Sequence, residues 1–272
     1  MLVREATTAD LRHVATDTAA SSHGLRLPTG THDATPLSFT ISVVIPTKNE
    51  ARNIGWVLER MEPLVDEIVI VDGLSHDGTI EAALRVRPDA VIVAHAVPGK
   101  GEAVRAGFAA ATGDLVVMLD ADGSMDPAEI STFVPALADG ADVAKESRFM
   151  AGGGTTDMTS LRKIGNACLV RVANFLLGTS HTELCYGHMA FRHSRLEELD
   201  LRASGFEIET ELVVKACRAG LAVVEVPSFE SPRRYGTSNL NTFRDGWRVM
   251  TLLRQVRHPY DDAIGVASVS QN

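Results

Sequence analysis

Short runs of β-branched and other apolar residues alternate with segments of helical spacing through the first half of the chain. The apolar runs cover residues 41–45, 67–71, 90–94 and 114–119, and the intervening segments cover 49–61, 77–86 and 100–111. Buried parallel strands read as continuous apolar runs, and such alternation is typical of a parallel sheet with helices on both faces. We therefore predict an α/β fold with a mostly parallel central sheet, and we take Asn49 as the N-cap of the first helix.

The second half has a looser pattern. It predicts helices near 128–138, 161–177, 209–219 and 244–256, and strands near 142–145, 190–192 and 221–226. We expect residues 39–258 to form one domain, with halves at about 39–127 and 128–258. Residues 1–38 and 259–272 are expected to be tails.

Composition excludes several classes of function. The chain has 272 residues, a formal net charge of -9 and only 5% aromatic residues, which argues against a nucleic-acid partner. No apolar run approaches the roughly 20 residues of a membrane span. Three widely spaced cysteines suit a reducing compartment. We expect a cytoplasmic protein, with peripheral contact at the inner face of the membrane left open.

The loops that follow the first four strands are expected to carry the chemistry. They cover residues 46–50, 72–79, 98–102 and 120–122. In a parallel α/β sheet, ligands bind at the carboxyl ends of the strands, so these loops would converge. No G-x-G-x-x-G follows the first strand and no Walker A motif occurs, which disfavours a dinucleotide dehydrogenase or a P-loop NTPase.

Asp120 and Asp122 flank Ala121 at the end of an apolar strand. Two like charges at such a position are costly unless a cation neutralises them, and carboxylate oxygens suit Mg²⁺ or Mn²⁺. A solvated turn is the alternative reading.

The neighbouring loops offer further polar groups. Asp72 ends the second strand and could accept hydrogen bonds from a base or a ribose, whereas Asp77 is expected to shape the turn before the next helix. Lys100 lies between two glycines, which favours either a close approach to a phosphate or an ordinary loop before a helix.

Taken together, these segments resemble the family 2 glycosyltransferases of the GT-A fold, and within them the dolichol-phosphate mannose synthase-like branch. The resemblance rests on residues 42–50, 71–79, 99–103 and 120–122 in the first half, and on 147–148, 183–187, 205–212, 225–227 and 233–238 in the second. It implies a GT-A fold and metal-dependent, inverting transfer from a UDP- or GDP-linked sugar. The acceptor would be a polyprenyl phosphate or a small molecule.

The resemblance also implies roles for individual residues. The nucleotide would lie against Pro46, Thr47, Glu50, Asp72, Lys100, Asp120 and Ala121, and Asp120 and Asp122 would hold Mg²⁺ or Mn²⁺. Asp122 and Glu211 are the catalytic candidates, with Glu211 as base or acceptor-positioning group, or else a carboxylate favoured at a helix start. Glu209 lies two residues away, and both need not face the cleft. The acceptor would be held by Arg148, Arg162, Arg233 and Ser238, although each arginine alone is equally typical of a surface charge.

Several alternatives remain open at this point. A sugar-1-phosphate nucleotidyltransferase and a non-catalytic nucleotide-sugar-binding protein are the rival functions. His181, His188 and Tyr186 could form a polar pocket for an acceptor other than a lipid phosphate, and a zinc site is poorly motivated because no compact His/Cys pattern occurs. Trp247 could dock on a membrane, although core packing or a contact in a homodimer fits its helical spacing better.

Overall fold

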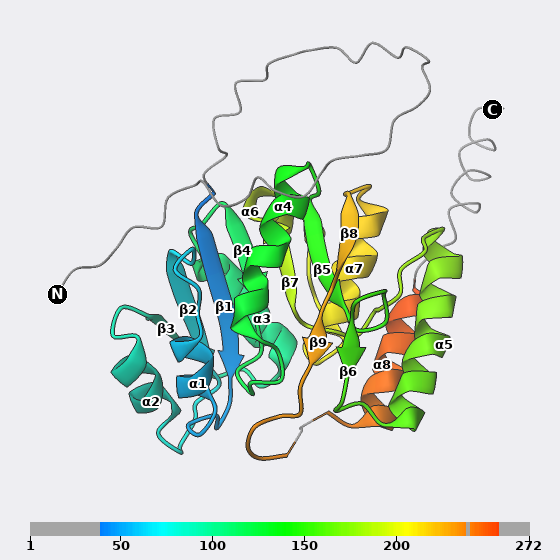
Figure 1. The fold of residues 1–272 in the computed structure, drawn as a ribbon. Helices are drawn as coiled ribbons and strands as arrows, with labels where there is room; N and C mark the ends of the chain where they lie inside the picture. The colour runs from blue at the N-terminus through cyan, green and yellow to red at the C-terminus, as the bar shows by residue number, and fades with distance from the viewer. Residues whose placement is uncertain (1–38, 238–239, 256–272) are drawn as a thin grey trace, which may run out of the picture. The chain divides into compact units, whose positions relative to one another are not determined.

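The computed structural model describes residues 39–237 and 240–255 (Figure 1). The expected tails at 1–38 and 259–272 lie outside the described residues. The described residues contain a central seven-stranded sheet in the order β3-β2-β1-β4-β7-β5-β8, and a small second sheet that pairs β6 with β9. The strands are β1 (Ile41–Thr47), β2 (Glu67–Asp72), β3 (Val91–Ala94), β4 (Leu115–Met118), β5 (Val143–Ser147), β6 (Gly154–Thr155), β7 (Met189–Arg192), β8 (Val223–Pro227) and β9 (Phe229–Glu230).

The main sheet is mostly parallel, which confirms the expected fold class. β1 pairs in parallel with β2 and β4, β2 with β3, and β5 with β8. The exception is β7, which runs antiparallel between β4 and β5 and so joins the two halves of the sheet.

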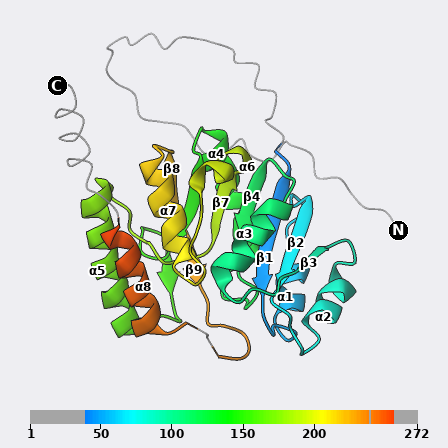
Figure 2. The same cartoon turned by 180° about the vertical axis from the view of Figure 1, so that it is seen from behind.

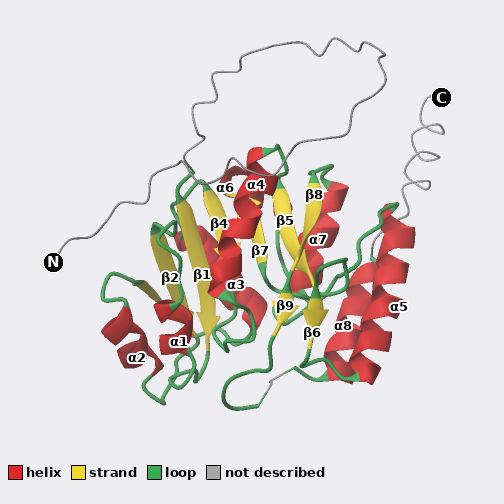
Figure 3. Ribbon diagram, in the orientation of Figure 1, coloured by secondary structure: helices red, strands yellow, loops and turns green. Residues whose placement is uncertain are grey.

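Helices cover both faces of this sheet (Figures 2 and 3). One face packs against α3 and α7, with α5 and α8 side by side beyond them, and the other packs against α1, α2, η1 and α4. The helices are α1 (Ile54–Glu59), α2 (Thr79–Val86), α3 (Lys100–Ala110), η1 (Pro127–Thr132), α4 (Phe133–Ala138), α5 (Ser160–Leu177), α6 (His193–Leu196), η2 (Glu197–Leu199), α7 (Ile208–Arg218) and α8 (Thr242–Arg254).

Alternate residues of the central strands enter different cores, which explains their unbroken apolar runs. In β1, Val44 packs on the side of α3, whereas Val43 and Ile45 pack on the side of α1. Because successive side chains of a strand point to opposite faces, a strand covered on both sides needs apolar residues at every position.

Two local expectations are wrong. The first helix begins at Ile54 with Asn53 as its N-cap, while Asn49 has a φ of 57° and accepts a hydrogen bond from the His76 N–H at 3.1 Å. Asparagine tolerates this left-handed conformation, so Asn49 shapes the loop instead of capping a helix.

Trp247 is 62% exposed, so it does not pack in the core, which was one of the two roles that its spacing suggested; the other, a contact in a homodimer, stays a prediction. The buried residues of α8 include Val249 and Leu253, which face the neighbouring helices. None of the described helices is both long and apolar enough to cross a membrane.

Candidate active site

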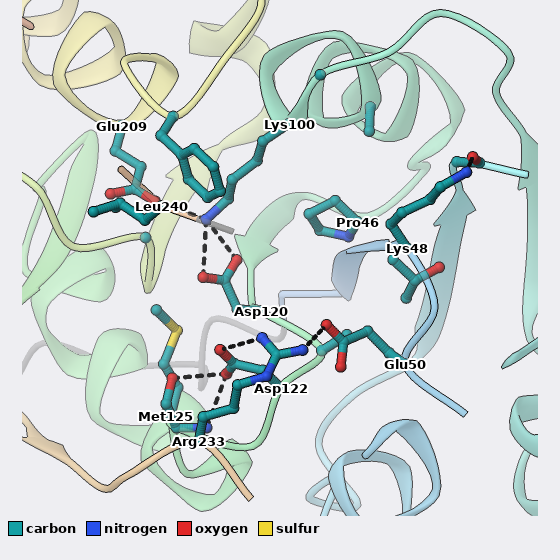
Figure 4. A pocket seen from close by; sticks show the side chains of 18 of the residues that line it. Pro46, Lys48, Glu50, Lys100, Asp120, Asp122, Met125, Glu209, Arg233 and Leu240 are labelled. Atoms are coloured by element: carbon teal, nitrogen blue, oxygen red, sulfur yellow. Dashed lines mark hydrogen bonds and ion pairs between the residues drawn. The ribbon is translucent and has the colours of Figure 1, made fainter. Parts of the chain in front are cut away.

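A cavity of about 490 Å³ opens where the first four strands end (Figure 4). Residues that follow β1, β2, β3 and β4 form one wall, because the carboxyl ends of these parallel strands meet at one edge of the sheet. Segments from the second half of the chain form the opposite wall. The candidates that line the cavity are Pro46, Thr47, Glu50, Lys100, Asp120, Ala121, Asp122, Arg148, Arg162 and Arg233.

Lys100 forms the centre of a buried charge cluster in this cavity. Its Nζ lies 2.6 Å from Asp120 Oδ1 and 2.7 Å from Glu209 Oε1. Burial opposes the charged form of Lys100, but the two carboxylates outweigh that effect and raise its pKa above the usual value. Burial also raises the pKa of Glu209, which Lys100 partly offsets. The cluster thus fixes Asp120 in place through a cation that belongs to the chain itself.

The glycines beside Lys100 serve a close backbone approach. A Cβ at Gly99 or Gly101 would collide with the carbonyl groups of Ser204 and Ala203, and the Gly101 N–H donates to Ser204 at 3.0 Å. Glu211 accepts hydrogen bonds from the same segment, including one of 2.7 Å from the Ala203 N–H. Glu211 therefore supports the segment that packs against the Lys100 loop, and it is not among the residues that line the cavity.

Asp122 is held from the opposite direction. Arg233 Nη1 lies 3.2 Å from Asp122 Oδ2, and its other terminal nitrogen contacts Glu50. The Ser124 N–H and hydroxyl donate to Asp122 Oδ1 at 3.0 and 2.7 Å. Arg233 was expected to bind an acceptor, but in this structure it pairs with the carboxylates of Asp122 and Glu50.

Asp120 and Asp122 fit a divalent cation. Both carboxylates line the cavity and offer oxygen ligands of the type that Mg²⁺ and Mn²⁺ prefer. Each carboxylate is balanced by one basic side chain, Lys100 or Arg233, so the site already supplies positive charge where a metal would sit.

Four of the seven expected nucleotide contacts lie on or near β1 and β2, whereas Lys100, Asp120 and Ala121 lie at the start of α3 and after β4. Pro46, Thr47 and Glu50 line the cavity, whereas Asp72 lies just behind the lining. Asp72 accepts hydrogen bonds from the Thr47 hydroxyl at 3.3 Å and from the Ser75 N–H at 2.8 Å. In this structure Asp72 orders the loop behind the wall.

The structural role expected for Asp77 is confirmed. Its carboxylate accepts from the Thr79 N–H at 3.1 Å, at the start of α2, and from the Ala51 N–H at 3.1 Å.

The remaining candidates for binding the acceptor, Arg148 and Arg162, differ in how strongly carboxylates of the chain already pair with their guanidinium groups. Arg148 is only 4% exposed and forms ion pairs with Glu183 at 2.8 Å and Glu230 at 2.9 Å. Arg162 lines the cavity with a longer contact of 3.6 Å to Asp157. Ser238 lies outside the described residues.

The pocket expected from His181, His188 and Tyr186 does not form. Tyr186 lines the cavity, but His188 is buried against Glu146 at 2.7 Å, and His181 lies 3.4 Å from Cys217 Sγ. Glu209 lines the cavity but was not among the predicted site residues. The only signal for it was its spacing from Glu211, since residues two apart on a helix face different directions.

Comparison with solved structures gives the class of the fold. Glucosyl-3-phosphoglycerate synthase from Mycobacterium tuberculosis, solved with Mn²⁺, UDP and glucosyl-3-phosphoglycerate, matches with a TM-score of 0.63 and 27% identity over 80% of each chain. The fold is therefore of the GT-A class. The sequence profile described as Glycosyl transferase family 2 matches residues 42–200, and the chain belongs to this family.

Relatives in sequence support the same assignment. The chain is 34% identical to polyprenol monophosphomannose synthase of Mycolicibacterium smegmatis, over 73% of this chain and 80% of the relative. It is 31% identical to glycosyltransferase AglJ of Haloferax volcanii, over 86% of this chain and 79% of the relative. A dolichol-phosphate mannosyltransferase of Pyrococcus furiosus is 31% identical over 81% of this chain, which spans 62% of that longer protein.

Proposed function

We propose that this chain is a metal-dependent, inverting glycosyltransferase that moves a hexosyl group from a UDP- or GDP-linked sugar to a polyprenyl phosphate. The donor side rests on the cavity at the ends of β1 to β4. Pro46, Thr47 and Glu50 offer a wall for the nucleoside, and Asp120 and Asp122 offer oxygen ligands beside it. The bound Mg²⁺ or Mn²⁺ would neutralise the diphosphate that leaves. The relative solved with UDP and Mn²⁺ supports this reading.

The observation that carries the acceptor class is the position of Arg162. Its side chain lines the cavity at the first turn of α5, and its ion pair with Asp157 is long and partly exposed. Arg148 is already paired by two carboxylates, and Arg233 by Asp122, so Arg162 is the arginine best placed to bind an acceptor phosphate.

Apolar side chains lie next to that arginine on the outer surface. Leu161 and Ile164 are both more than half exposed on the same turns of α5. A phosphate at Arg162 would therefore leave an attached lipid chain beside an apolar surface. A water-soluble acceptor would have no use for these exposed side chains.

The outer face of α5 and α8 extends this surface, and we propose that it rests on a membrane. The large apolar residues exposed on it are Leu161, Ile164, Phe175, Phe243 and Trp247. The two helices carry six basic residues and one acidic residue, Asp245, whereas the whole chain has 35 acidic and 26 basic residues. Apolar side chains flanked by positive charge suit a surface of anionic lipid.

The proposed acceptor also removes the need for a strong general base. A phosphate is anionic at neutral pH, so its oxygen can attack the anomeric carbon directly. Glu209, held by Lys100, would orient Asp120 and the groups around it. Glu211 does not line the cavity, so we do not propose it as the base.

The test is a transfer assay with the purified chain. UDP-glucose and GDP-mannose would each be supplied with Mn²⁺ or Mg²⁺, together with either a polyprenyl phosphate in detergent or 3-phosphoglycerate. Mass spectrometry should find a hexosyl phosphopolyprenol and an equal amount of nucleoside diphosphate. The Asp122→Asn variant should lose this metal-dependent product. Transfer to 3-phosphoglycerate alone would refute the lipid acceptor, and release of pyrophosphate would refute glycosyl transfer.

A further inference from the structure

A second group of potential metal ligands lies between the sheet and η1, apart from the cavity. Glu129 is on η1, Glu146 is on β5, and His188 immediately precedes β7. One ligand atom from each of the three lies within 4.8 Å of the other two, close enough for a single ion to bridge them with little movement. None of the three lines the cavity.

Two of these side chains are fully buried and incompletely paired. Glu146 and His188 are both 0% exposed, and His188 Nδ1 lies 2.7 Å from Glu146 Oε2. Within the described part of the chain, the other oxygen, Glu146 Oε1, and the other ring nitrogen, His188 Nε2, have no hydrogen-bond partner. Buried polar atoms are almost always satisfied, so two orphaned atoms in one cluster point to a missing ligand.

The charge of the cluster points to a dication. The described residues provide neither Glu129 nor Glu146 with an ion pair to a lysine or arginine, although they place the half-buried carboxylate of the first beside the fully buried carboxylate of the second. We propose that Glu129, Glu146 and His188 bind one Zn²⁺ ion. One dication balances both carboxylates, and one imidazole nitrogen with two carboxylate oxygens is a ligand set that zinc accepts.

This site differs in chemistry from the Asp120 and Asp122 pair. Asp120 and Asp122 offer carboxylates alone, which suit Mg²⁺ or Mn²⁺, whereas an imidazole favours Zn²⁺ or its usual probe Co²⁺. The ring of Phe133 meets the His188 ring edge to face at 5.0 Å, which holds the imidazole in its orientation.

The ion would stabilise the wall of the cavity that Tyr186 and Arg148 form. The Ser228 hydroxyl donates to Glu129 at 2.6 Å and lies 3.3 Å from the Tyr186 hydroxyl. The Tyr186 ring lies 4.3 Å from the guanidinium of Arg148, and both residues line the cavity. Fixing Glu129 would therefore fix this chain of contacts, so the role of the ion is structural and independent of the sugar donor.

The test is zinc binding by the full chain with Asp120→Asn and Asp122→Asn, which removes the cavity pair. After treatment with a chelator, calorimetric titration with Zn²⁺ should show one equivalent bound. Adding His188→Gln should weaken that binding by more than about 100-fold, beyond the cost of losing an outer-shell partner. His193→Gln is the matched control, because His193 bonds a carbonyl elsewhere, and it should change nothing.

Co²⁺ supplies a second readout. The visible absorption of bound Co²⁺ should appear in the same protein and persist in excess Mg²⁺. It should lack the thiolate charge-transfer band expected if Co²⁺ bound instead to Cys217 and His181, which lie side by side. If His188→Gln does not fold, Glu129→Gln on the half-buried side of the cluster should show the same loss. Absence of zinc binding, equal binding by His188→Gln, or loss of binding in Cys217→Ser would each overturn the proposal.

Discussion

At the scale of single residues, the two glutamates of α7 have different surroundings. Glu209 faces the cavity and pairs with Lys100, whereas Glu211 turns away and accepts hydrogen bonds from the Arg202 and Ala203 N–H groups. One carboxylate therefore belongs to the charge cluster in the cavity, and the other supports the backbone behind it.

This difference gives a paired prediction. Glu209→Gln should lower kcat/KM at least about 10-fold with little loss of stability, because it removes the second negative charge at Lys100. Glu211→Gln should lower the free energy of unfolding by about 1–3 kcal/mol, because it weakens charge-assisted hydrogen bonds from the partly buried Arg202 and Ala203 N–H groups. Steady-state kinetics and urea unfolding of both variants measure the two effects. A drop in kcat/KM for Glu211→Gln at unchanged stability would reverse the assignment.

Residue types at the site could be predicted better than their orientation. Asp120, Asp122, Lys100 and Thr47 line the cavity as the strand-end argument implies, since the sheet brings their loops together. The choice between Glu209 and Glu211 depended on the rotation of α7, which packing sets. Residues two apart differ by about 200° around a helix, so spacing shows that only one faces the cleft but not which.

At the scale of elements, α5 and α8 stand out because their outer faces combine exposed apolar and basic side chains. We predict that the purified chain binds vesicles containing anionic lipid and that salt weakens the binding. The double variant Phe243→Ser with Trp247→Ser should reduce the bound fraction several-fold while leaving the fold intact. Leu84→Ser, which alters an exposed apolar residue of α2 instead, is the control.

Vesicle flotation at low and high salt measures this. Equal binding to neutral and anionic vesicles would contradict the charge argument. Unchanged binding of the double variant would show that α8 is not the contact surface. Self-association of the parent chain that the double variant loses would instead assign the face to a homodimer.

Strands could be predicted where burial on both faces of the sheet requires an unbroken apolar run. The ends of helices were harder to predict where contacts made by the neighbouring loop determine them. The apolar runs of β1, β2 and β4 identified buried strands because both sheet faces are covered. The predicted start of α1 is wrong because Asn49 adopts a left-handed conformation and accepts a hydrogen bond from the His76 N–H. Local spacing of apolar residues does not reveal such a long-range contact. Nothing in the four residues of β7 indicates that it runs antiparallel.

At the scale of the whole molecule, the two expected halves share one sheet and both cores. β4 from the first half pairs with β7 from the second, and Val44 and Phe108 pack in the same core as Phe191 and Leu212. The sequence indicated where the motifs change character, near residue 127, but this is not a boundary between separate cores.

We therefore predict that residues 39–127 alone do not fold cooperatively. The fragment would expose the edge of β4 and the apolar surface that β7 and α7 cover in the whole chain. Thermal unfolding followed by circular dichroism should show no sigmoidal transition for the fragment and a clear one for 39–258. A cooperative transition in the fragment would mean that the nucleotide half is a domain in its own right.

The pairing of Arg233 with Asp122 and of Lys100 with Asp120 has a consequence for ligand entry. Because both carboxylates are paired with basic side chains of the chain itself, binding of a metal ion there would exchange ionic partners and would not fill a void. The free energy measured for a metal ion is then a difference, the gain from the new contacts minus the cost of parting the old ones. Arg233 and Lys100 would stay in the cavity, each still paired with a second carboxylate, Glu50 or Glu209. They would then lie close to any diphosphate that follows the metal ion, and they could pair with Asp122 and Asp120 again once it has left.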